Sequence, residues 1–471
     1  DINKLNETWG TIFWSQTYNT FEEIPLPKPT ITTHNPSLRM EHERFRSESI
    51  EKYAKFQVDL LKEILGKDSV IIHDFSGGYF DKSYDFSKVG KHMDVVAYNN
   101  YPVWGGQKEP IPAWEIACGL DYMRGIKGQN FWITEAIMGA QGHDVIGYLP
   151  RPRQAKMWSY QGIAHGCSSL MYFRYRGATK GAEQYCYGII DQDNVKRRKF
   201  YEVQSFFKEM KDNEALTQSE VKSDVAVVYD YESMASFRIQ RQSFLMDYKQ
   251  EVYRLYRPFY KKNINMDVIP SDSDFDKYKV LLLPVMIVHK KEVQDKVRKF
   301  VSGGGTVVFT YRTAVKDYYN NLTLGQFNPT YYTDLVGGYV EEVESFQDDQ
   351  VAFLIGNEEF EGINGTATVF RDMLKTTTAK TLFKYEDEFF EDLAAVTLNE
   401  YEGGKVYYIG SGADNTIMDA IANKIINESN LDAIESEEGV EVVRRSINNE
   451  DYYFVMNHTS DEKKFRNEIL K

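Results

Sequence analysis

Phe131-Trp-Ile-Thr-Glu135 is the stretch that decides the fold, because it is a short apolar run that stops on a carboxylate. Such a run is typical of a buried parallel strand whose carboxyl end opens onto a loop. Three similar runs lie around it, at residues 69–75, 94–98 and 169–173. Helical spacing of apolar residues over 43–65, 112–124 and 152–165 alternates with these runs. This alternation predicts right-handed crossovers and a parallel sheet, with only four strand and helix units visible.

The pattern restarts after a polar linker predicted at residues 216–223. Strands are expected at 224–229, 278–288, 306–311 and 404–410, with helices at 246–262, 290–301 and 415–428. This order predicts an open, doubly wound α/β domain of the flavodoxin type. The run Gly303–Gly305 follows a helix and precedes a strand, so a helix C-cap turn is favoured over a phosphate loop.

Two alternating runs, 439–446 and 452–456, are joined at residues 448–451 and predict a β-hairpin. The chain is therefore divided into three parts: residues 1–215, an α/β domain over 224–430, and an incomplete antiparallel β domain over 436–471.

The bulk composition excludes several classes of protein. A net charge of −14 argues against a nucleic-acid partner, because phosphate repels an acidic surface. No apolar run approaches the ~20 residues that cross a bilayer, so we expect no membrane partner. The three cysteines are far apart and fit neither a metal site nor a disulfide framework, which favours a reducing, cytoplasmic setting. Aromatic residues make up 14% of the chain, which suits both a packed core and a sugar site.

Carboxylates near the ends of the first four strands are the candidates for chemistry. Glu135 at a strand end fits a nucleophile, a general base or a metal ligand, and equally a structural partner of an arginine. Glu183 follows the fourth strand by ten residues, where a solvated loop glutamate is the default interpretation. The pairs His73-Asp74 and His143-Asp144 lack zinc spacing, so structural roles are favoured for them.

Several strings together resemble glycoside hydrolase family 42. They are Leu5–Gln16, Asn35–Leu38 with Arg44-Phe45, Asn99–Pro102, Trp132–Glu135, Ala164–Gly166, and Phe173–Arg176 with Gly181–Gln184. They occur in the order of the family's motifs across residues 3–190. The resemblance implies that residues 1–215 are the second half of a (β/α)8 TIM barrel, strands 5–8. It also implies a trimerisation domain and a small, truncated β domain behind it.

The resemblance implies roles for individual residues. Glu135 matches the nucleophile, Tyr101 a tyrosine near the sugar, and Glu183 a glutamate that holds galactose hydroxyls. Trp14 matches a sugar-site tryptophan that a neighbouring subunit can supply. The acid/base glutamate would lie before residue 1. No cofactor or metal is implied.

The expected activity is retaining hydrolysis that removes terminal, non-reducing β-D-galactose from β-galactosides, by a homotrimer. Two alternatives stay open. One is a catalytically incompetent fragment that keeps only the oligomerisation scaffold and part of the sugar site. The other is a related hydrolase acting on α-L-arabinosides, because His143 and Cys186 stand where many members have a tryptophan and a histidine.

Overall fold

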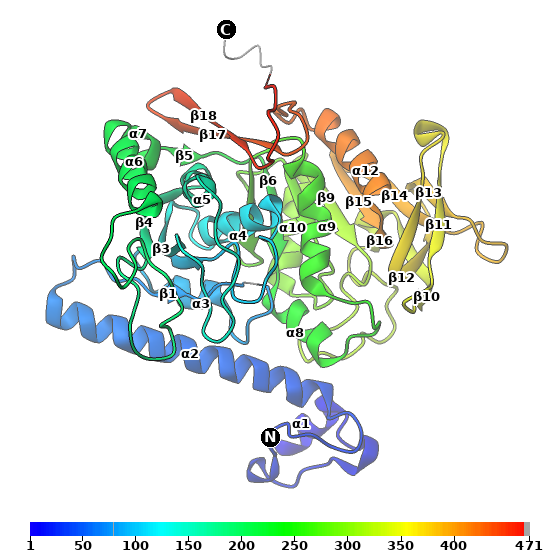
Figure 1. The fold of residues 1–471 in the computed structure, drawn as a ribbon. Coiled ribbons are helices and arrows are strands. Elements are labelled where there is room, and N and C mark those ends of the chain that lie inside the picture. The colour runs from blue at the N-terminus through cyan, green and yellow to red at the C-terminus, as the bar shows by residue number, and fades with distance from the viewer. Residues whose placement is uncertain (79, 466–471) are drawn as a thin grey trace.

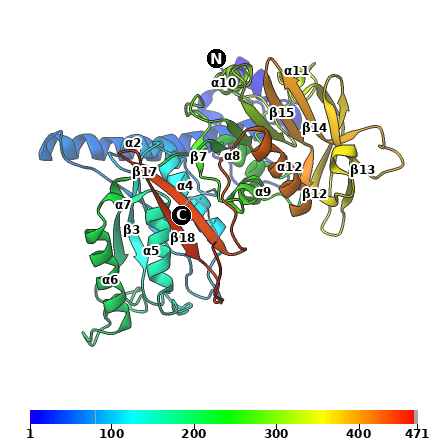
Figure 2. The ribbon, with the colours of Figure 1, turned by 90° about the horizontal axis from the view of Figure 1, so that it is seen from above.

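Figure 1 shows the fold in a computed structural model that describes residues 1–78 and 80–465. Three sheets organise it: one of four strands, one of eleven and one of three. Seen from above, the four-stranded and eleven-stranded parts lie side by side, and the long helix α2 (Pro36–Leu65) runs along both (Figure 2). No described helix is long and apolar enough to cross a membrane.

The four-stranded sheet is parallel with the order β1-β2-β3-β4, which confirms the predicted alternation. Its strands are β1 (Asp74–Phe75), β2 (Ala97–Asn100), β3 (Phe131–Ile137) and β4 (Cys167–Phe173). The first strand is much shorter than the predicted 69–75. The reason is local, because the Ile71 amide donates to the Asp94 carboxylate at 2.7 Å instead of joining the ladder.

Helices cover this sheet: α3 (Phe86–Gly90), α4 (Ala113–Gly125), α5 (Gln154–Ala164) and α6 (Arg198–Asp212). Helix α2 ends before Gly66 as predicted but begins seven residues earlier than expected. The Asn35 side chain caps it by accepting from the amides of Ser37 and Leu38, and Pro36 occupies the first turn. Helix α1 (Ile2–Trp9) and two 3-10 turns form an arm at one end of α2 (Figure 1).

The segment predicted as a polar linker, residues 216–223, is ordered. These residues form part of α7 (Ala215–Gln218) and strand β5 (Glu220–Val221), which pairs antiparallel with β17 near the C-terminus. The guanidinium of Arg445, which is completely buried, donates to the carbonyls of Ile163 and Ser219. Its partners lie more than 200 residues away in sequence, so no local pattern reveals that this segment is ordered.

The parallel half of the large sheet has the order β7-β6-β8-β9-β15, the flavodoxin type that was predicted. Its strands are β6 (Val225–Tyr229), β7 (Met266–Pro270), β8 (Val280–Leu283), β9 (Thr306–Thr310) and β15 (Gly404–Ile409). The helices are α8 (Tyr231–Ile239), α9 (Tyr248–Tyr260), α10 (Lys291–Ser302) and α12 (Asn415–Glu428). Strand β8 ends well before the predicted residue 288, and Val285 lies beyond it at a φ of 38°. Gly303 caps α10, as predicted.

An antiparallel extension of this sheet was not predicted. It comprises β10 (Gly338–Ser345), β11 (Ala352–Gly356), β12 (Asn364–Thr376), β13 (Lys380–Tyr385), β14 (Ala394–Tyr401) and β16 (Ser411–Ala413), with α11 (Thr333–Val336). Several of these strands alternate buried and exposed residues, so their apolar content is diluted in the sequence.

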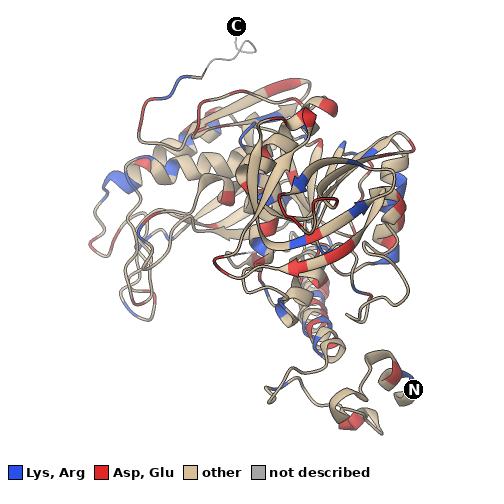
Figure 3. Ribbon diagram, turned by 90° about the vertical axis from the view of Figure 1, so that its right-hand side faces the viewer, with Lys and Arg blue, Asp and Glu red and all other residues tan. Residues whose placement is uncertain are grey.

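The predicted C-terminal hairpin is confirmed as β17 (Val440–Ile447) and β18 (Glu450–Asn457). Asn448 and Asn449 have φ values of 52° and 63°, the left-handed pair of a type I′ turn. Residues 466–471 of the predicted β domain lie outside the described residues. Acidic and basic residues are interspersed over the molecule, and many of them form ion pairs (Figure 3).

A buried polar junction holds the three parts together. His165, at the end of α5, contacts Asp121 of α4 at 2.7 Å through Nδ1 and Glu441 of β17 at 2.8 Å through Nε2. Arg124 of α4 donates to Asp267 of β7 at 2.8 Å. All of these side chains are buried. Each charge therefore depends on its partner for solvation.

This junction makes stability depend on pH. Burial alone would lower the pKa of His165, but Asp121 and Glu441 outweigh it and raise the pKa to about 9. The raised pKa contributes stability that is complete below the ordinary histidine pKa and is lost as pH rises through about 9. We expect the thermal midpoint of the native chain to fall between pH 7 and pH 10. The His165→Gln variant should be less stable at pH 7 and should lose much of this dependence. A native-like slope in the variant would contradict the assignment.

Candidate active site

The carboxyl ends of the four parallel strands meet at one edge of the small sheet, and this edge carries the candidate residues. Glu135 lies on β3, and Tyr101 follows the neighbouring strand β2. The Tyr101 hydroxyl donates to Glu135 Oε2 at 2.7 Å. Both side chains are half-buried. A direct hydrogen bond thus joins two of the four residues nominated from the sequence.

Glu183 belongs to the same neighbourhood. Its carboxylate accepts from the guanidinium of Arg174, which follows β4, and lies 3.8 Å from His143 Nε2. Its side chain is 44% exposed, so it stays open to solvent while it contributes to the electrostatics of Glu135. Glu183 therefore lies in a solvent-exposed loop, as expected by default, and its charge also acts on Glu135, the candidate nucleophile.

Aromatic rings border this edge. Trp104 packs edge-on against Tyr101, with ring centroids 4.9 Å apart, and His143 packs on Trp104 at 5.5 Å. Phe173, at the end of β4, lies 6.4 Å from the Tyr101 ring. Sequence reasoning missed Trp104, although it stands three residues after Tyr101 in the loop that follows a strand end. A pyranose ring has apolar C–H faces that pack on such walls.

Asp74 is a further carboxylate in this neighbourhood. It received a structural role, and it does accept a hydrogen bond from the Thr134 hydroxyl. The Asn99 amide also lies 3.5 Å from its Oδ2. Its position as the first residue of the short strand β1 also places its charge near Glu135. The available signal was its location in the first strand of the four.

Trp14 is not brought to Glu135 within one chain. It belongs to the N-terminal arm, whose Thr8 carbonyl accepts from Asn321 Nδ2 at 2.9 Å, a residue of the α/β domain. Figures 1 and 2 both show the arm apart from the four-stranded sheet. The indole is 58% exposed and packs on Phe13.

The surroundings of Glu135 raise its pKa. Burial is the largest cause, and the nearby charges of Asp74 and Glu183 act in the same direction. The Tyr101 hydrogen bond and the Arg174 guanidinium oppose this rise. Burial, together with the Glu135 carboxylate, also raises the pKa of Tyr101, so its hydroxyl stays a hydrogen-bond donor. In the described residues, no group of three or more His, Cys, Asp or Glu is placed to hold a metal ion.

These opposing effects predict how two variants shift the acid limb of activity. A nucleophilic carboxylate must be ionised, so activity falls as pH drops through its pKa. Tyr101→Phe removes a hydrogen bond that lowers the pKa of Glu135, so the limb in kcat/KM should move to higher pH. Glu183→Gln removes a charge that raises this pKa, so the limb should move to lower pH. Shifts of the same sign in both variants, measured with a chromogenic substrate, would show that the limb does not belong to Glu135.

A carboxylate among aromatic walls at the carboxyl ends of parallel strands is the arrangement of a glycoside hydrolase. The comparisons agree. Residues 1–213 match the family model for the β-galactosidase domain of glycosyl hydrolase family 42. Residues 223–432 match the β-galactosidase trimerisation domain, and residues 439–468 the β-galactosidase C-terminal domain.

Known proteins resemble the chain along nearly its whole length. The β-galactosidase LacZ of Heyndrickxia coagulans is 30% identical over 462 residues, which is 97% of this chain and 68% of the relative. BgaA of Clostridium cellulovorans is 29% identical over 98% of this chain and 70% of the relative. The crystal structure of the Bacillus circulans sp. alkalophilus β-galactosidase has a TM-score of 0.92 at 28% identity, covering 99% of this chain and 70% of that one. The chain belongs to glycoside hydrolase family 42, and the predicted fold class is confirmed.

Proposed function

We propose that this protein hydrolyses terminal, non-reducing β-D-galactosides with retention of configuration, using Glu135 as the nucleophile. The observation that carries the proposal is the hydrogen bond from Tyr101 to Glu135 Oε2 at 2.7 Å. It fixes one carboxylate oxygen and assigns the other, Oε1, to the sugar. The β-galactosidase names of the relatives favour galactosides over the arabinoside alternative.

In the first step Glu135 Oε1 attacks the anomeric carbon, and the glycosidic bond breaks as a proton reaches the leaving oxygen. The product is a galactosyl ester of Glu135. In the second step water attacks that ester and gives a proton to the acid/base carboxylate that protonated the leaving oxygen. This step releases galactose and the free Glu135 carboxylate. Tyr101 holds the nucleophile in position, and Glu183 and Arg174 are suited to bind sugar hydroxyls.

The acid/base carboxylate is proposed to come from sequence before residue 1. Of the carboxylates near Glu135, Asp74 accepts from Thr134 and Glu183 is bound by Arg174. Asp74 is therefore engaged by the strand beside it, and Glu183 is assigned to sugar hydroxyls, so neither is proposed to exchange a proton with the leaving group. General acid catalysis contributes about 10²–10⁴-fold, so its source matters for natural substrates with poor leaving groups.

The substrate assignment is tested by comparing kcat/KM for nitrophenyl β-D-galactoside, α-L-arabinoside and β-D-glucoside. The expected order places the β-galactoside first. A clear preference for the arabinoside would support the related hydrolase instead. No turnover of any of them by folded residues 1–471, beside clear turnover by a chain that also contains the acid/base segment, would support the incompetent fragment.

The proposed assembly is a homotrimer in which the N-terminal arm supplies Trp14 to a neighbouring sugar site. The arm exposes Ile12, Phe13 and Trp14, at 85%, 67% and 58%, more apolar surface than a free segment normally carries. We expect light scattering to give the mass of three chains. Ile12→Asp should weaken the assembly by placing a charge in the contact, whereas the exposed control Val195→Asp should not. A monomer in the native chain would contradict the assembly.

We further propose the division of the chain into residues 1–215, 224–430 and 436–471, a role in carbohydrate metabolism, and a cytoplasmic location. The matched ranges of the family models support the division. Cys118, Cys167 and Cys186 are free and buried, which suits a reducing compartment.

A further inference from the structure

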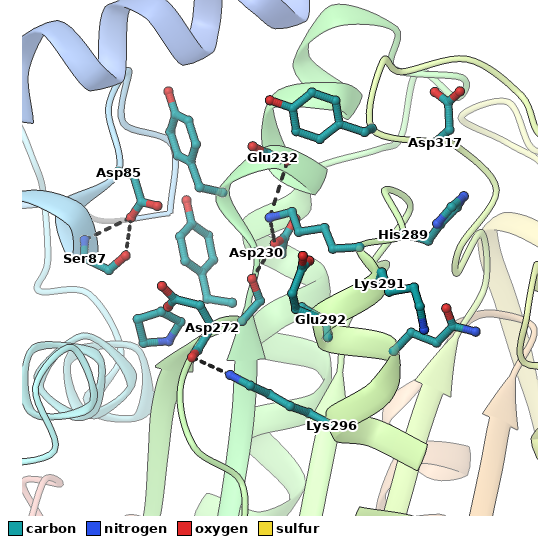
Figure 4. A pocket seen from close by; sticks show the side chains of 18 of the residues that line it. Asp85, Ser87, Asp230, Glu232, Asp272, His289, Lys291, Glu292, Lys296 and Asp317 are labelled. Carbon is teal, nitrogen blue, oxygen red and sulfur yellow. Dashed lines mark hydrogen bonds and ion pairs between the residues drawn. The ribbon is translucent and has the colours of Figure 1, made fainter. Parts of the chain in front are cut away.

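A cavity of about 880 Å³ lies at the carboxyl ends of β6, β7 and β8 in the α/β domain (Figure 4). Its walls are the segments that follow these strands, residues 229–232, 270–272 and 289–291. Residues 85–88 close one side, and residues 317–319 with Tyr331 close the other. None of Glu135, Tyr101 or Glu183 lines it. It is therefore separate from the candidate active site.

The position of the cavity follows from the strand order. The chain passes from β6 to β7 on one side of β6 and later places β8 on its other side. The connections leave β6 in opposite directions, which opens a crevice at the carboxyl ends of the strands. Ligands of open α/β sheets bind in such crevices, and the volume falls within the roughly 300–1,000 Å³ of small-molecule sites.

The deep charges of the cavity neutralise one another. Lys290 Nζ lies 2.7 Å from Asp230 Oδ2 and 3.4 Å from Glu232 Oε2. Glu232 also accepts from Arg44 Nε at 2.9 Å. Asp230 in addition caps α8 by accepting from the Ser233 amide at 2.7 Å. These groups build the wall and have little capacity left for a charged ligand.

The groups left open to a ligand are aromatic rings and a few polar side chains. Tyr319 and Tyr331 are 41% and 43% exposed, whereas the Tyr318 ring is covered by the Arg44 guanidinium, 3.6 Å from its centroid. His289 packs edge-on against Tyr331 with centroids 5.0 Å apart, and burial lowers its pKa, so its imidazole is neutral near pH 7. Figure 4 shows Asp85 at one side of the cavity, where its Oδ1 accepts from the Ser87 amide at 2.9 Å and from the Ser87 hydroxyl at 2.7 Å. The acceptors that a ligand can use are Asp85 Oδ2 and the carboxylate of the exposed Glu292.

The balance of charge selects the class of ligand. Six carboxylates and four lysines line the cavity, and Arg44 behind the wall pairs with Glu232, so one negative charge is left in excess with a neutral histidine. That balance disfavours phosphate groups, and so nucleotides. Exposed rings with nearby hydrogen-bond acceptors instead suit a ligand that has both apolar faces and hydroxyl groups.

We propose that this cavity is a second, non-catalytic carbohydrate-binding site that takes a neutral mono- or oligosaccharide. The sugar stacks on Tyr319 and Tyr331, and its hydroxyls donate to Glu292 and Asp85. The proposal stands apart from the proposed hydrolysis, because it rests on different residues in a different domain.

The test is equilibrium dialysis with labelled lactose, with inorganic phosphate as a second probe. A Glu135→Gln background prevents hydrolysis. In that background the Tyr319→Ala/Tyr331→Ala double variant should bind one lactose fewer per chain. The reason is that the affinity of the cavity for lactose should fall by at least about tenfold. Tyr201→Ala, which removes a 57% exposed ring from α6, is the matched control and should bind as the background does.

Two further measurements keep the result interpretable. With Glu135 intact, the double variant should keep the native kcat/KM on nitrophenyl β-galactoside. If the double variant fails to fold, Glu292→Ala at an exposed position should weaken lactose binding in the same way. The proposal would be overturned if both variants bound lactose as the background does. It would also be overturned if the variants changed the binding of phosphate but not that of lactose.

Discussion

Glu135→Gln should lower kcat/KM on β-galactosides by about 10⁴-fold or more, because it removes the group that forms the covalent intermediate. Glutamine keeps the size of the side chain and can still bond the Tyr101 hydroxyl, so the site should stay intact. In the shortened Glu135→Ala variant, added azide or formate should partly restore turnover, because it has room to attack the anomeric carbon in place of the carboxylate, and its product should have the α configuration. Steady-state kinetics with product analysis by NMR measures both effects.

The same variant should be at least as stable as the native chain near neutral pH. Burial with the charges of Asp74 and Glu183 raises the pKa of Glu135, so the ionised carboxylate costs stability in the folded state. Glutamine removes that cost. The advantage should shrink as pH falls and Glu135 takes up a proton. Asp74→Asn is the matched control, because it removes a neighbouring carboxylate and leaves Glu135, the proposed nucleophile, in place. Native turnover in Glu135→Gln would refute the assignment.

Arg124→Met should be the most destabilising single change in the buried junction, at about 3–5 kcal/mol. Arg124 donates to Asp121 Oδ1 at 2.7 Å and to Asp267 Oδ1 at 2.9 Å, and its side chain is 4% exposed. It also donates to the carbonyls of His165 and Met266. Methionine fills similar space but leaves two buried carboxylates without this partner.

Thermal unfolding should therefore show a midpoint several degrees lower in Arg124→Met. Arg298→Met is the matched control. Arg298 forms a two-pronged pair with Asp334 at 2.8 Å, but the side chains are 30% and 50% exposed, so its removal should cost about 0–1 kcal/mol. Equal destabilisation of Arg124→Met and Arg298→Met would show that burial does not determine how much the ion pairs of the junction contribute to stability.

The parts of this fold that sequence reasoning predicted are those with local signals. Three features could be recognised from residues that are close together in the sequence. They are the four short apolar runs, the flavodoxin-type alternation and the Asn448-Asn449 turn. The start of α2 was also readable, since Asn35-Pro36 is a cap followed by a first-turn proline. Apolar periodicity alone placed the start at residue 43, whereas the Asn35–Leu38 string, which resembles a helix entry of the family, marks the observed start.

The missed parts depend on distant partners. Strand β5 forms because it pairs with β17 and because Arg445 donates to the Ser219 carbonyl beside it. In the antiparallel extension, the apolar residues are interspersed with exposed residues. At the candidate site, Glu135 and Tyr101 were found because adjacent parallel strands end at the same edge. Trp104 and Asp74 were not, because one lies in a loop and the other had a simpler structural interpretation.

The most direct test of the central claim is the identity of the residue that carries the sugar. A 2-deoxy-2-fluoro-β-galactosyl fluoride needs little proton donation to its leaving group, so it probes the nucleophile without depending on the acid/base residue. Peptide mass spectrometry after brief incubation should find one fluorinated hexose on the peptide that contains Glu135, and none in Glu135→Gln. A label on Asp74 or Glu183 instead would contradict the account.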